Sequence, residues 1–191
     1  MYEAIEDPYC YPGTNILKNR LNLRDPAKLA EFEAFITAQR ADEPLPAGNL
    51  DYRHYCAIHR HLFQDVYSWA GRLRTVRLSK GDSTFCYPEH IDREMRRLFA
   101  NLRAQNYLRK LGVRTFAEKA AHLVAELNAI HPFREGNGRT QLTYLTILAD
   151  RTGHPLALEG LNSKAMIASV IKSFQGDERA LVEVIGDLVQ R

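Results

Sequence analysis

The sequence predicts an all-α domain of about seven helices that carries one small β-hairpin. Two observations lead to this prediction. Apolar side chains recur at spacings of three and four residues along most of the chain, which is typical of amphipathic helices. Only residues 73–86 change to β-prone residues on either side of a turn. We expect one domain at residues 25–191, after an extended segment at residues 1–24.

Composition narrows the class of protein. A formal net charge of +3 is too mild to argue for nucleic acid as a partner. The three cysteines, Cys10, Cys56 and Cys86, fit neither a disulfide framework nor a zinc pattern, which favours a reducing compartment. No apolar run approaches the roughly 18 residues needed to span a bilayer, and the acidic N-terminus shows no signal peptide. We therefore expect a cytoplasmic protein without a membrane partner.

The first helix is predicted to begin at Pro26. Asp25 precedes it, and aspartate at the N-cap followed by proline is a strong helix-start signal. Residues 41–49 then form a loop rich in proline and glycine. The apolar stripe expected on this first helix consists of Leu29, Phe32, Phe35 and Ile36.

The next helix is predicted over residues 51–69. His54, His59 and His61 lie in it and raise the question of a metal site. They do not share one helix face with a third ligand, so we expect solvated or capping roles for them. The apolar positions at helical spacing are Tyr55, Ile58, Leu62, Phe63 and Val66.

The hairpin is predicted within residues 73–86. Thr75, Val76 and Leu78 precede a turn at residues 80–82, and residues 84–86 are again β-prone. A hairpin of this size is marginally stable alone in water. We therefore expect it to lean on the helical body or to be mobile.

Three more helices are predicted at residues 88–105, 163–174 and 178–189, with a linking segment at 107–113. The first of them is rich in arginine, which we expect to form a solvated face rather than a nucleic-acid contact. These arginines are Arg93, Arg96, Arg97 and Arg103.

Residues 131–139, HPFREGNGR, separate two predicted helices at 116–130 and 140–152. We call residues 131–139 the motif loop. Gly136 and Gly138 are free to adopt positive φ, so the loop is predicted to turn a helix–loop–helix corner.

The motif loop has the composition of an anion site. Backbone N–H groups of a glycine-rich loop and of a helix start lack intrahelical partners, and with the helix dipole they bind phosphate. Arg134 and Arg139 would add charge-assisted bonds to phosphate oxygens. Glu135 would require a hard cation such as Mg²⁺, and His131 would carry a proton, because imidazole titrates at about pH 6.5. Together these groups indicate phosphoryl or nucleotidyl transfer.

Each part of the loop also has a purely structural explanation. A glycine-containing turn after a helix is often only a C-cap, and a histidine before proline is more often a capping or core residue than a base. Neither GxxxxGK[ST] nor GxGxxG occurs, which excludes the ordinary P-loop and Rossmann sites. The combination favours a catalytic loop without naming the reaction.

A resemblance adds the reaction. HPFREGNGRT is similar to the signature of the Fic family, His-x-Phe-x-(Asp/Glu)-Gly-Asn-Gly-Arg-x-x-Arg. Three upstream stretches resemble other parts of that family in the same order: YPGTNILKN at residues 11–19, IHRHLFQDVYSWAGRLR at 58–74 and KGDSTFC at 80–86. The resemblance covers most of the chain. It departs from the pattern at Leu142, where the last arginine falls.

The resemblance implies a protein adenylyltransferase that moves AMP from ATP to a tyrosine, threonine or serine hydroxyl of a target protein. It assigns His131 as the general base, Glu135 as the ligand of Mg²⁺ and Arg139 as the partner of the leaving pyrophosphate. Asn137 and the loop N–H groups would steady the α-phosphate, while Phe133 would mainly anchor the loop in the core. The residues implied in nucleotide binding are Phe133, Arg134, Gly136, Asn137, Gly138 and Arg139.

The hairpin resembles the family's flap, which binds an extended segment of the target by strand addition. We use "flap" for its target-docking residues, Ser79, Lys80, Gly81 and Asp82.

Many members of the family also carry an inhibitory helix with the pattern (Ser/Thr)-x-x-x-Glu-(Gly/Asn). Glu159 and Gly160 come closest to it here, but Pro155 stands at the Ser/Thr position. We therefore expect restraint by a small antitoxin-like partner that supplies such a helix.

Several alternatives to AMP transfer stay open. Some family members transfer phosphate, and in those a lysine tends to replace the second motif glycine, which here is Gly138. Others transfer UMP or phosphocholine. Because Leu142 departs from the pattern, the chain is alternatively a catalytically weak module that binds a nucleotide or a partner.

Overall fold

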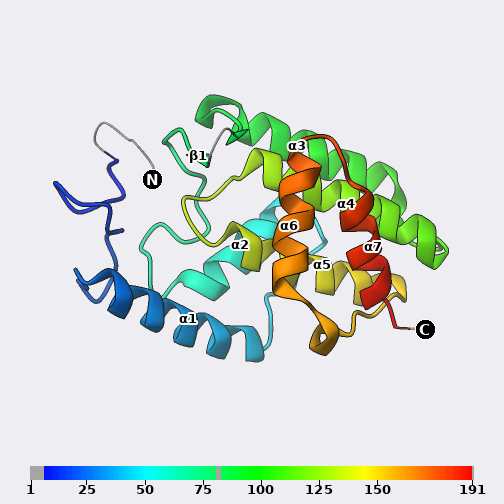
Figure 1. Cartoon of the computed structure of the whole chain (residues 1–191), viewed down its shortest axis with the longest axis horizontal. Helices are drawn as coiled ribbons and strands as arrows, with labels where there is room; N and C mark the ends of the chain where they lie inside the picture. Colours follow the sequence, from blue (N-terminus) through cyan, green and yellow to red (C-terminus); the bar gives the residue numbers. More distant parts are fainter. Residues whose placement is uncertain (1–6, 81–82, 191) are drawn as a thin grey trace.

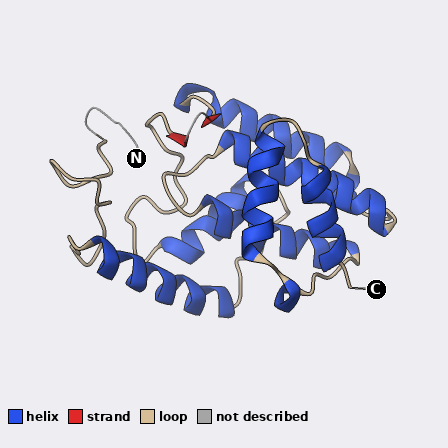
Figure 2. Cartoon of the chain, in the orientation of Figure 1, coloured by secondary structure: helices blue, strands red, loops and turns tan. Residues whose placement is uncertain are grey.

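A computed structural model describes residues 7–80 and 83–190, which form a helical domain (Figure 1). Outside the helices, the regular structure in these residues is two short strands beside the start of α3 (Figure 2). The predicted all-α fold with one small hairpin is confirmed. The α-helices are α1 (Pro26–Asp42), α2 (Tyr52–Phe63), α3 (Pro88–Ala104), α4 (Val113–Ile130), α5 (Asn137–Thr152), α6 (Ser163–Phe174) and α7 (Arg179–Leu188), with short 3-10 turns at Asn106–Leu108 and Leu158–Gly160.

Helix α4 is the centre of the domain, and α3, α5, α6 and α7 all pack against it. Phe116, Ala120 and Ala121 have no exposed surface. The small alanines let neighbouring helices approach closely, which concentrates the core around this helix. The helix that leads into the motif loop is therefore buried among four other helices. Its buried residues are Phe116, Ala117, Ala120, Ala121, Leu123, Val124, Ala125, Leu127 and Ile130.

Helix α1 begins as predicted. The Asp25 carboxylate accepts hydrogen bonds from the N–H groups of Ala27 and Lys28, at 2.9 and 3.1 Å. The predicted apolar stripe is wrong at Phe35, whose surface is 61% exposed. Helix α1 lies along one edge of the molecule (Figure 1) and packs mainly on α2, so one narrow face suffices to attach it.

Helix α2 ends at Phe63, six residues before the predicted end. The N–H groups of Val66 and Tyr67 both donate to the Phe63 carbonyl, at 3.0 and 2.9 Å, which closes the helix in a turn. The chain then folds back, and the rings of Tyr67 and Trp69 stack with 4.4 Å between centroids. Residues 64–69, which the apolar pattern placed on the helix, thus form a packed turn after it.

The hairpin is shorter than predicted. Its strands, β1 (Ser79–Lys80) and β2 (Ser83–Thr84), pair antiparallel, and the Phe85 N–H donates to the Leu78 carbonyl at 3.1 Å. Leu78 and Phe85 are buried, so the hairpin leans on the helical body as expected. Of the predicted turn at residues 80–82, Lys80 lies in β1, and residues 81–82 lie outside the described residues.

The remaining helices follow the prediction closely. Helix α6 has the predicted bounds, and α7 is one residue shorter at each end than predicted. Arg93, Arg96 and Arg97 on α3 are exposed and make ion pairs with nearby carboxylates. No helix in the described part of the chain combines the length and the apolar character that crossing a membrane requires.

Candidate active site

His131 ends helix α4 in the left-handed conformation, with φ of 49°, while its N–H still donates to Leu127 at 2.9 Å. This conformation costs about 1 kcal/mol or more in a residue other than glycine, so other contacts must hold it. The imidazole stacks on the ring of Phe85 with 4.0 Å between centroids. The predicted base is therefore fixed between the end of the central helix and the end of the hairpin.

Arg74 holds the backbone at this junction, a role that the sequence did not reveal. Its guanidinium is 2% exposed, and it donates to the carbonyls of His131 at 2.7 Å and Ile130 at 3.2 Å. It also donates to the carbonyls of Val76 and Cys86, both at 2.6 Å. The Val76 carbonyl, which lies in the predicted first strand, is thus bonded to a side chain and not to a second strand. Burial lowers the pKa of Arg74 to about 10, which still leaves it charged at neutral pH.

Asn137 closes the motif loop instead of facing a ligand. Its side-chain oxygen accepts from the Phe133 N–H at 2.9 Å, and its amide nitrogen donates to the Phe133 carbonyl at 2.8 Å. Asn137 is 2% exposed and both ends of its amide are bonded to the Phe133 backbone, so its contact with the α-phosphate stays a prediction. The Phe133 ring has no exposed surface and stacks on His59 at 3.8 Å, as expected for an anchor.

Only Gly136 uses the conformational freedom expected of both motif glycines. It has φ of 81° and forms the N-cap of α5. A Cβ atom there would lie 2.3 Å from the Phe63 ring, so nothing larger fits. Gly138 lies inside α5 with open space around it, because that helix begins at Asn137 and not at residue 140.

His59 of α2 contacts the motif loop through a hydrogen bond and a ring contact. Its Nδ1 accepts from the Gly71 N–H at 2.8 Å, so its Nε2 carries the proton and donates to the Glu135 carbonyl at 3.0 Å. Burial, with a smaller contribution from the charge of Arg139, lowers the pKa of His59 to about 4. The imidazole is therefore neutral near pH 7, and the predicted solvated or capping role is wrong.

The other two histidines of α2 are also structural. His54 is buried, and its Nε2 lies 2.7 Å from the Pro46 carbonyl, while the Nε2 of His61 lies 2.7 Å from the Arg40 carbonyl. Among residues 7–80 and 83–190, no three histidine, cysteine or acidic side chains come together as a metal site.

Arg134 does not face the predicted anion site. It is 6% exposed and donates from Nε to the Asp7 carboxylate at 2.7 Å, while its Nη2 lies 3.9 Å from the Cys10 sulfur. The predicted phosphate contact of Arg134 is thus replaced by a buried ion pair with the N-terminal segment. Asp7 lies 127 residues away in sequence, so no local pattern predicted this pairing.

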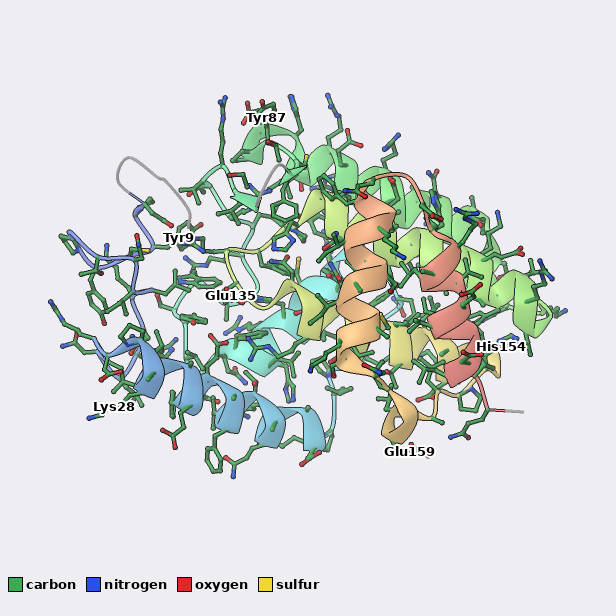
Figure 3. The ribbon with its side chains drawn as sticks, in the orientation of Figure 1. Tyr9, Lys28, Tyr87, Glu135, His154 and Glu159 are labelled. Atoms are coloured by element: carbon green, nitrogen blue, oxygen red, sulfur yellow. The ribbon has the colours of Figure 1, made fainter. Side chains whose placement is uncertain are left out.

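Glu135 and Arg139 are the half-exposed charges of the loop (Figure 3 labels Glu135, on the segment between α4 and α5). Glu135 accepts from the Gly136 N–H at 2.9 Å, and its carboxylate lies 3.9 Å from the Arg139 guanidinium. Mg²⁺ is commonly held by one or two carboxylates together with substrate phosphates. A single accessible carboxylate beside an anion site therefore fits Mg²⁺ that is bound with a nucleotide.

The start of α5 offers unused donors. Within the described residues, the N–H groups of Asn137, Gly138 and Arg139 have no acceptor, whereas the Gly136 N–H is taken by Glu135. Three such groups at the N-terminus of a 16-residue helix favour an anion. The predicted anion site stays a prediction, and the N–H groups available to it are those of residues 137–139.

Comparison with known proteins points to one family. The family model described as "Fic/DOC family" matches residues 49–149. The chain is 50% identical over 189 residues to "Probable protein adenylyltransferase y4lH" of Sinorhizobium fredii, and the match covers 98% of both proteins. It is 37% identical over 179 residues to "Probable protein adenylyltransferase Fic" of Salmonella typhimurium, covering 92% of this chain and 88% of that protein.

Solved structures agree with this match. BepC of Bartonella tribocorum with bound AMPPNP superposes with a TM-score of 0.85 at 28% identity, covering 96% of this chain and 98% of that one. The N-terminal Fic domain of a Bep effector of Bartonella quintana with bound ADP gives a TM-score of 0.87 at 28% identity, covering 96% and 94%.

The Phe63 ring lies close to Gly136 but to neither Gly138 nor Gly153, so the three glycines should differ in how much an alanine destabilises the protein. Gly136→Ala should lower the free energy of unfolding by about 2 kcal/mol or more, because a clash with Phe63 adds to the cost of positive φ. Gly153→Ala has nearly the same φ in open space and should cost only about 1 kcal/mol. Gly138→Ala should stay within about 1 kcal/mol of wild type. Urea denaturation of the three variants tests this, and equal losses at residues 136 and 153 would contradict the clash.

The neutral His59 predicts a pH dependence of stability. In the unfolded chain a histidine takes up a proton at about pH 6.5, whereas folded His59 does so only at about pH 4. Its contribution is therefore complete above pH 6.5 and falls as the pH drops toward 4, by about 3 kcal/mol in total. Denaturation at several pH values between 4 and 7 gives the free energy of unfolding as a function of pH. This free energy should change less with pH in His59→Gln than in wild type, and as much as in wild type in the exposed control His90→Gln. An equal pH dependence of the unfolding free energy in wild type and His59→Gln would refute the contribution of His59.

Proposed function

This chain belongs to the Fic/DOC family and is a nucleotidyltransferase, and on that premise we propose that it moves AMP from ATP to a tyrosine, threonine or serine hydroxyl of another protein. One observation carries the proposal: the unused N–H groups at the start of α5 belong to the same motif loop as His131 and as the half-exposed Glu135 and Arg139. The relatives named protein adenylyltransferases, and the neighbours described with AMPPNP or ADP, support a nucleotide as the anion.

His131 would act as the general base. A side-chain hydroxyl is a poor nucleophile at neutral pH, so a positioned imidazole that takes its proton accelerates attack by about 10²–10⁴-fold. Arg74 and Phe85 support this role, because they hold the carbonyl and the ring of His131 before any substrate arrives. Little rearrangement would then be needed for proton transfer.

The phosphates would lie over the start of α5. The N–H groups of Asn137, Gly138 and Arg139 would receive the charge that develops on the α-phosphate, and the guanidinium of Arg139 would neutralise the leaving pyrophosphate. Glu135 would hold Mg²⁺, and the metal would supply further charge neutralisation. Phe133 and Asn137 would contribute by shaping the loop.

The hairpin would dock the target protein. Ser79 and Lys80 form a strand that pairs on one side with β2, and an extended peptide is able to add to the other edge of such a strand. Phe85 continues from this hairpin to the His131 ring, so a docked segment would lie near the base. Gly81 and Asp82 belong to the same proposal, although they lie outside the described residues.

We further propose a restraining partner in trans, a small antitoxin-like protein. The support is the sequence itself, in which no (Ser/Thr)-x-x-x-Glu-(Gly/Asn) match occurs. Purification from the native host should recover such a partner, whereas recovery of a wholly inactive, partner-free monomer would count against it.

A second candidate function is a weak nucleotide- or partner-binding module. Leu142 favours it: this half-buried side chain lies one turn after Arg139 in α5, where the family pattern has an arginine. A leucine cannot bind a γ-phosphate. The base, the carboxylate and the helix N–H groups are nevertheless all present, so we favour a transferase with reduced affinity for ATP.

The reaction is tested by incubation of the protein and a host lysate with ATP labelled at the α- or the γ-phosphate. Transfer of the α-label supports AMP transfer, transfer of the γ-label alone indicates a kinase, and transfer of neither supports the binding module. His131→Ala should abolish transfer but leave ATP binding within a few-fold of wild type, because the histidine serves proton transfer. A variant that retains more than about a tenth of the activity would exclude His131 as the base.

Leu142→Arg tests the departure from the family pattern. The new arginine should tighten ATP binding about tenfold or more and raise transfer at low ATP, because a hydrogen bond to a charged group is worth about 1.5–3 kcal/mol. Isothermal titration calorimetry with a non-hydrolysable ATP analogue measures the change. Unchanged affinity together with high wild-type activity would mean that residue 142 does not face the nucleotide.

A further inference from the structure

A carboxylate from outside the motif loop reaches into the candidate site. Glu33 lies on α1, 106 residues before Arg139, and its side chain is only 12% exposed. One carboxylate oxygen accepts from the Arg139 guanidinium, and the other accepts from the Tyr67 hydroxyl. Neither contact belongs to the chemistry assigned to the motif loop above.

These contacts fix Arg139, a side chain that is otherwise long and flexible. Its Nη1 donates to the Thr37 hydroxyl at 3.1 Å, and its guanidinium lies 4.7 Å from the centre of the Phe63 ring. Arginine has about 2 kcal/mol of rotamer entropy to lose when it is ordered. The contacts from α1 and α2 remove that freedom before a substrate binds, although 40% of the side chain stays exposed.

Tyr67 in turn fixes Glu33. Its ring is 2% exposed and stacks on Trp69 in the turn after α2. Burial, and then the nearby charge of Glu33, raise the pKa of Tyr67 far above its ordinary value, so its hydroxyl stays protonated and keeps donating. Tyr67, Glu33 and Arg139 therefore form one continuous chain of hydrogen bonds from the packed turn to the start of α5.

We propose that Glu33 is a positioning residue, which holds the Arg139 guanidinium where it receives the charge that develops on the leaving pyrophosphate. The inference rests on the proposed AMP transfer. Because the ion pair is already made in the free protein, it adds little to the attraction of ATP. Its contribution belongs to the transition state, in which a correctly oriented guanidinium is needed.

This role has a definite kinetic signature. Removing the charge of Glu33 takes away the ion pair that orients Arg139 and leaves the more distant Glu135 carboxylate, at 3.9 Å, so the guanidinium is freer to move. With one negative charge fewer beside Arg139, the site attracts ATP at least as strongly, so KM for ATP should stay the same or fall. A mobile guanidinium is poorly placed for the leaving group, so kcat should fall. A latch that keeps Arg139 away from the nucleotide would give the opposite result, a rise in kcat.

The experiment is a double-mutant cycle on the full chain with α-labelled ATP. Glu33→Gln, which preserves side-chain size, should lower kcat about tenfold or more without raising KM. Arg139→Ala should lower kcat at least as much, and the double variant should be no worse than Arg139→Ala alone, because Glu33 acts only through that arginine. Glu31→Gln, an exposed acid on the same helix, is the matched control and should leave both constants unchanged.

Tyr67→Phe is an independent test of the positioning role of Glu33. It keeps the carboxylate and the aromatic ring but loses one hydrogen bond to Glu33, so kcat should fall by less than in Glu33→Gln. Thermal unfolding of every variant separates a loss of positioning from a loss of folding. Independent, multiplicative losses in the double variant, an increase in kcat, or a KM effect without a kcat effect would each overturn the inference.

The two proposals fail in different ways. If wild type transfers no α-label, the proposal of AMP transfer is wrong, and the positioning role of Glu33, which depends on it, is wrong too. If wild type transfers the label and Glu33→Gln does so at the same rate, AMP transfer stands and only the positioning role is wrong.

Discussion

The geometry of the candidate site depends on a buried arginine that pairs with no carboxylate among residues 7–80 and 83–190. Arg74 donates to four backbone carbonyls, two at the end of α4 and two at the ends of the hairpin. Such a charge is tolerable away from water because the carbonyl end of a helix carries partial negative charge, and each charge-assisted bond is worth about 1.5–3 kcal/mol. The same interaction therefore stabilises the charge and joins the hairpin to the His131 backbone.

The motif loop is held from its other side by neutral groups. Asn137 closes the loop on Phe133, and Phe133 stacks on the uncharged imidazole of His59. Gly136 lets the backbone pass close to Phe63. Because these groups satisfy one another, the loop needs no bound ligand to keep its shape. The N–H groups at the start of α5 are organised in advance, which is what stabilising a developing charge requires.

Sequence alone predicted the parts of the fold that local signals determine. Asp25 before a proline specified the start of α1, and apolar periodicity specified α4 and its burial. The parts it missed depend on partners far away in the chain. Arg134 is paired with Asp7, and the Val76 carbonyl within the predicted first strand is bonded to the side chain of Arg74. The start of α5 was placed three residues late, because the side-chain closure by Asn137 is invisible in a pattern of apolar residues.

Burial divides the polar side chains of the motif loop into two groups. Arg134 and Asn137 are 6% and 2% exposed and are occupied by protein partners. Glu135 and Arg139 keep 44% and 40% of their side chains exposed at the start of α5. Arg134 and Arg139 have the same chemistry and lie five positions apart, so residue type cannot tell which of them meets a substrate. Their partners differ: Asp7 holds Arg134 inside the protein, whereas Arg139 is paired with Glu33 from α1 and still reaches solvent.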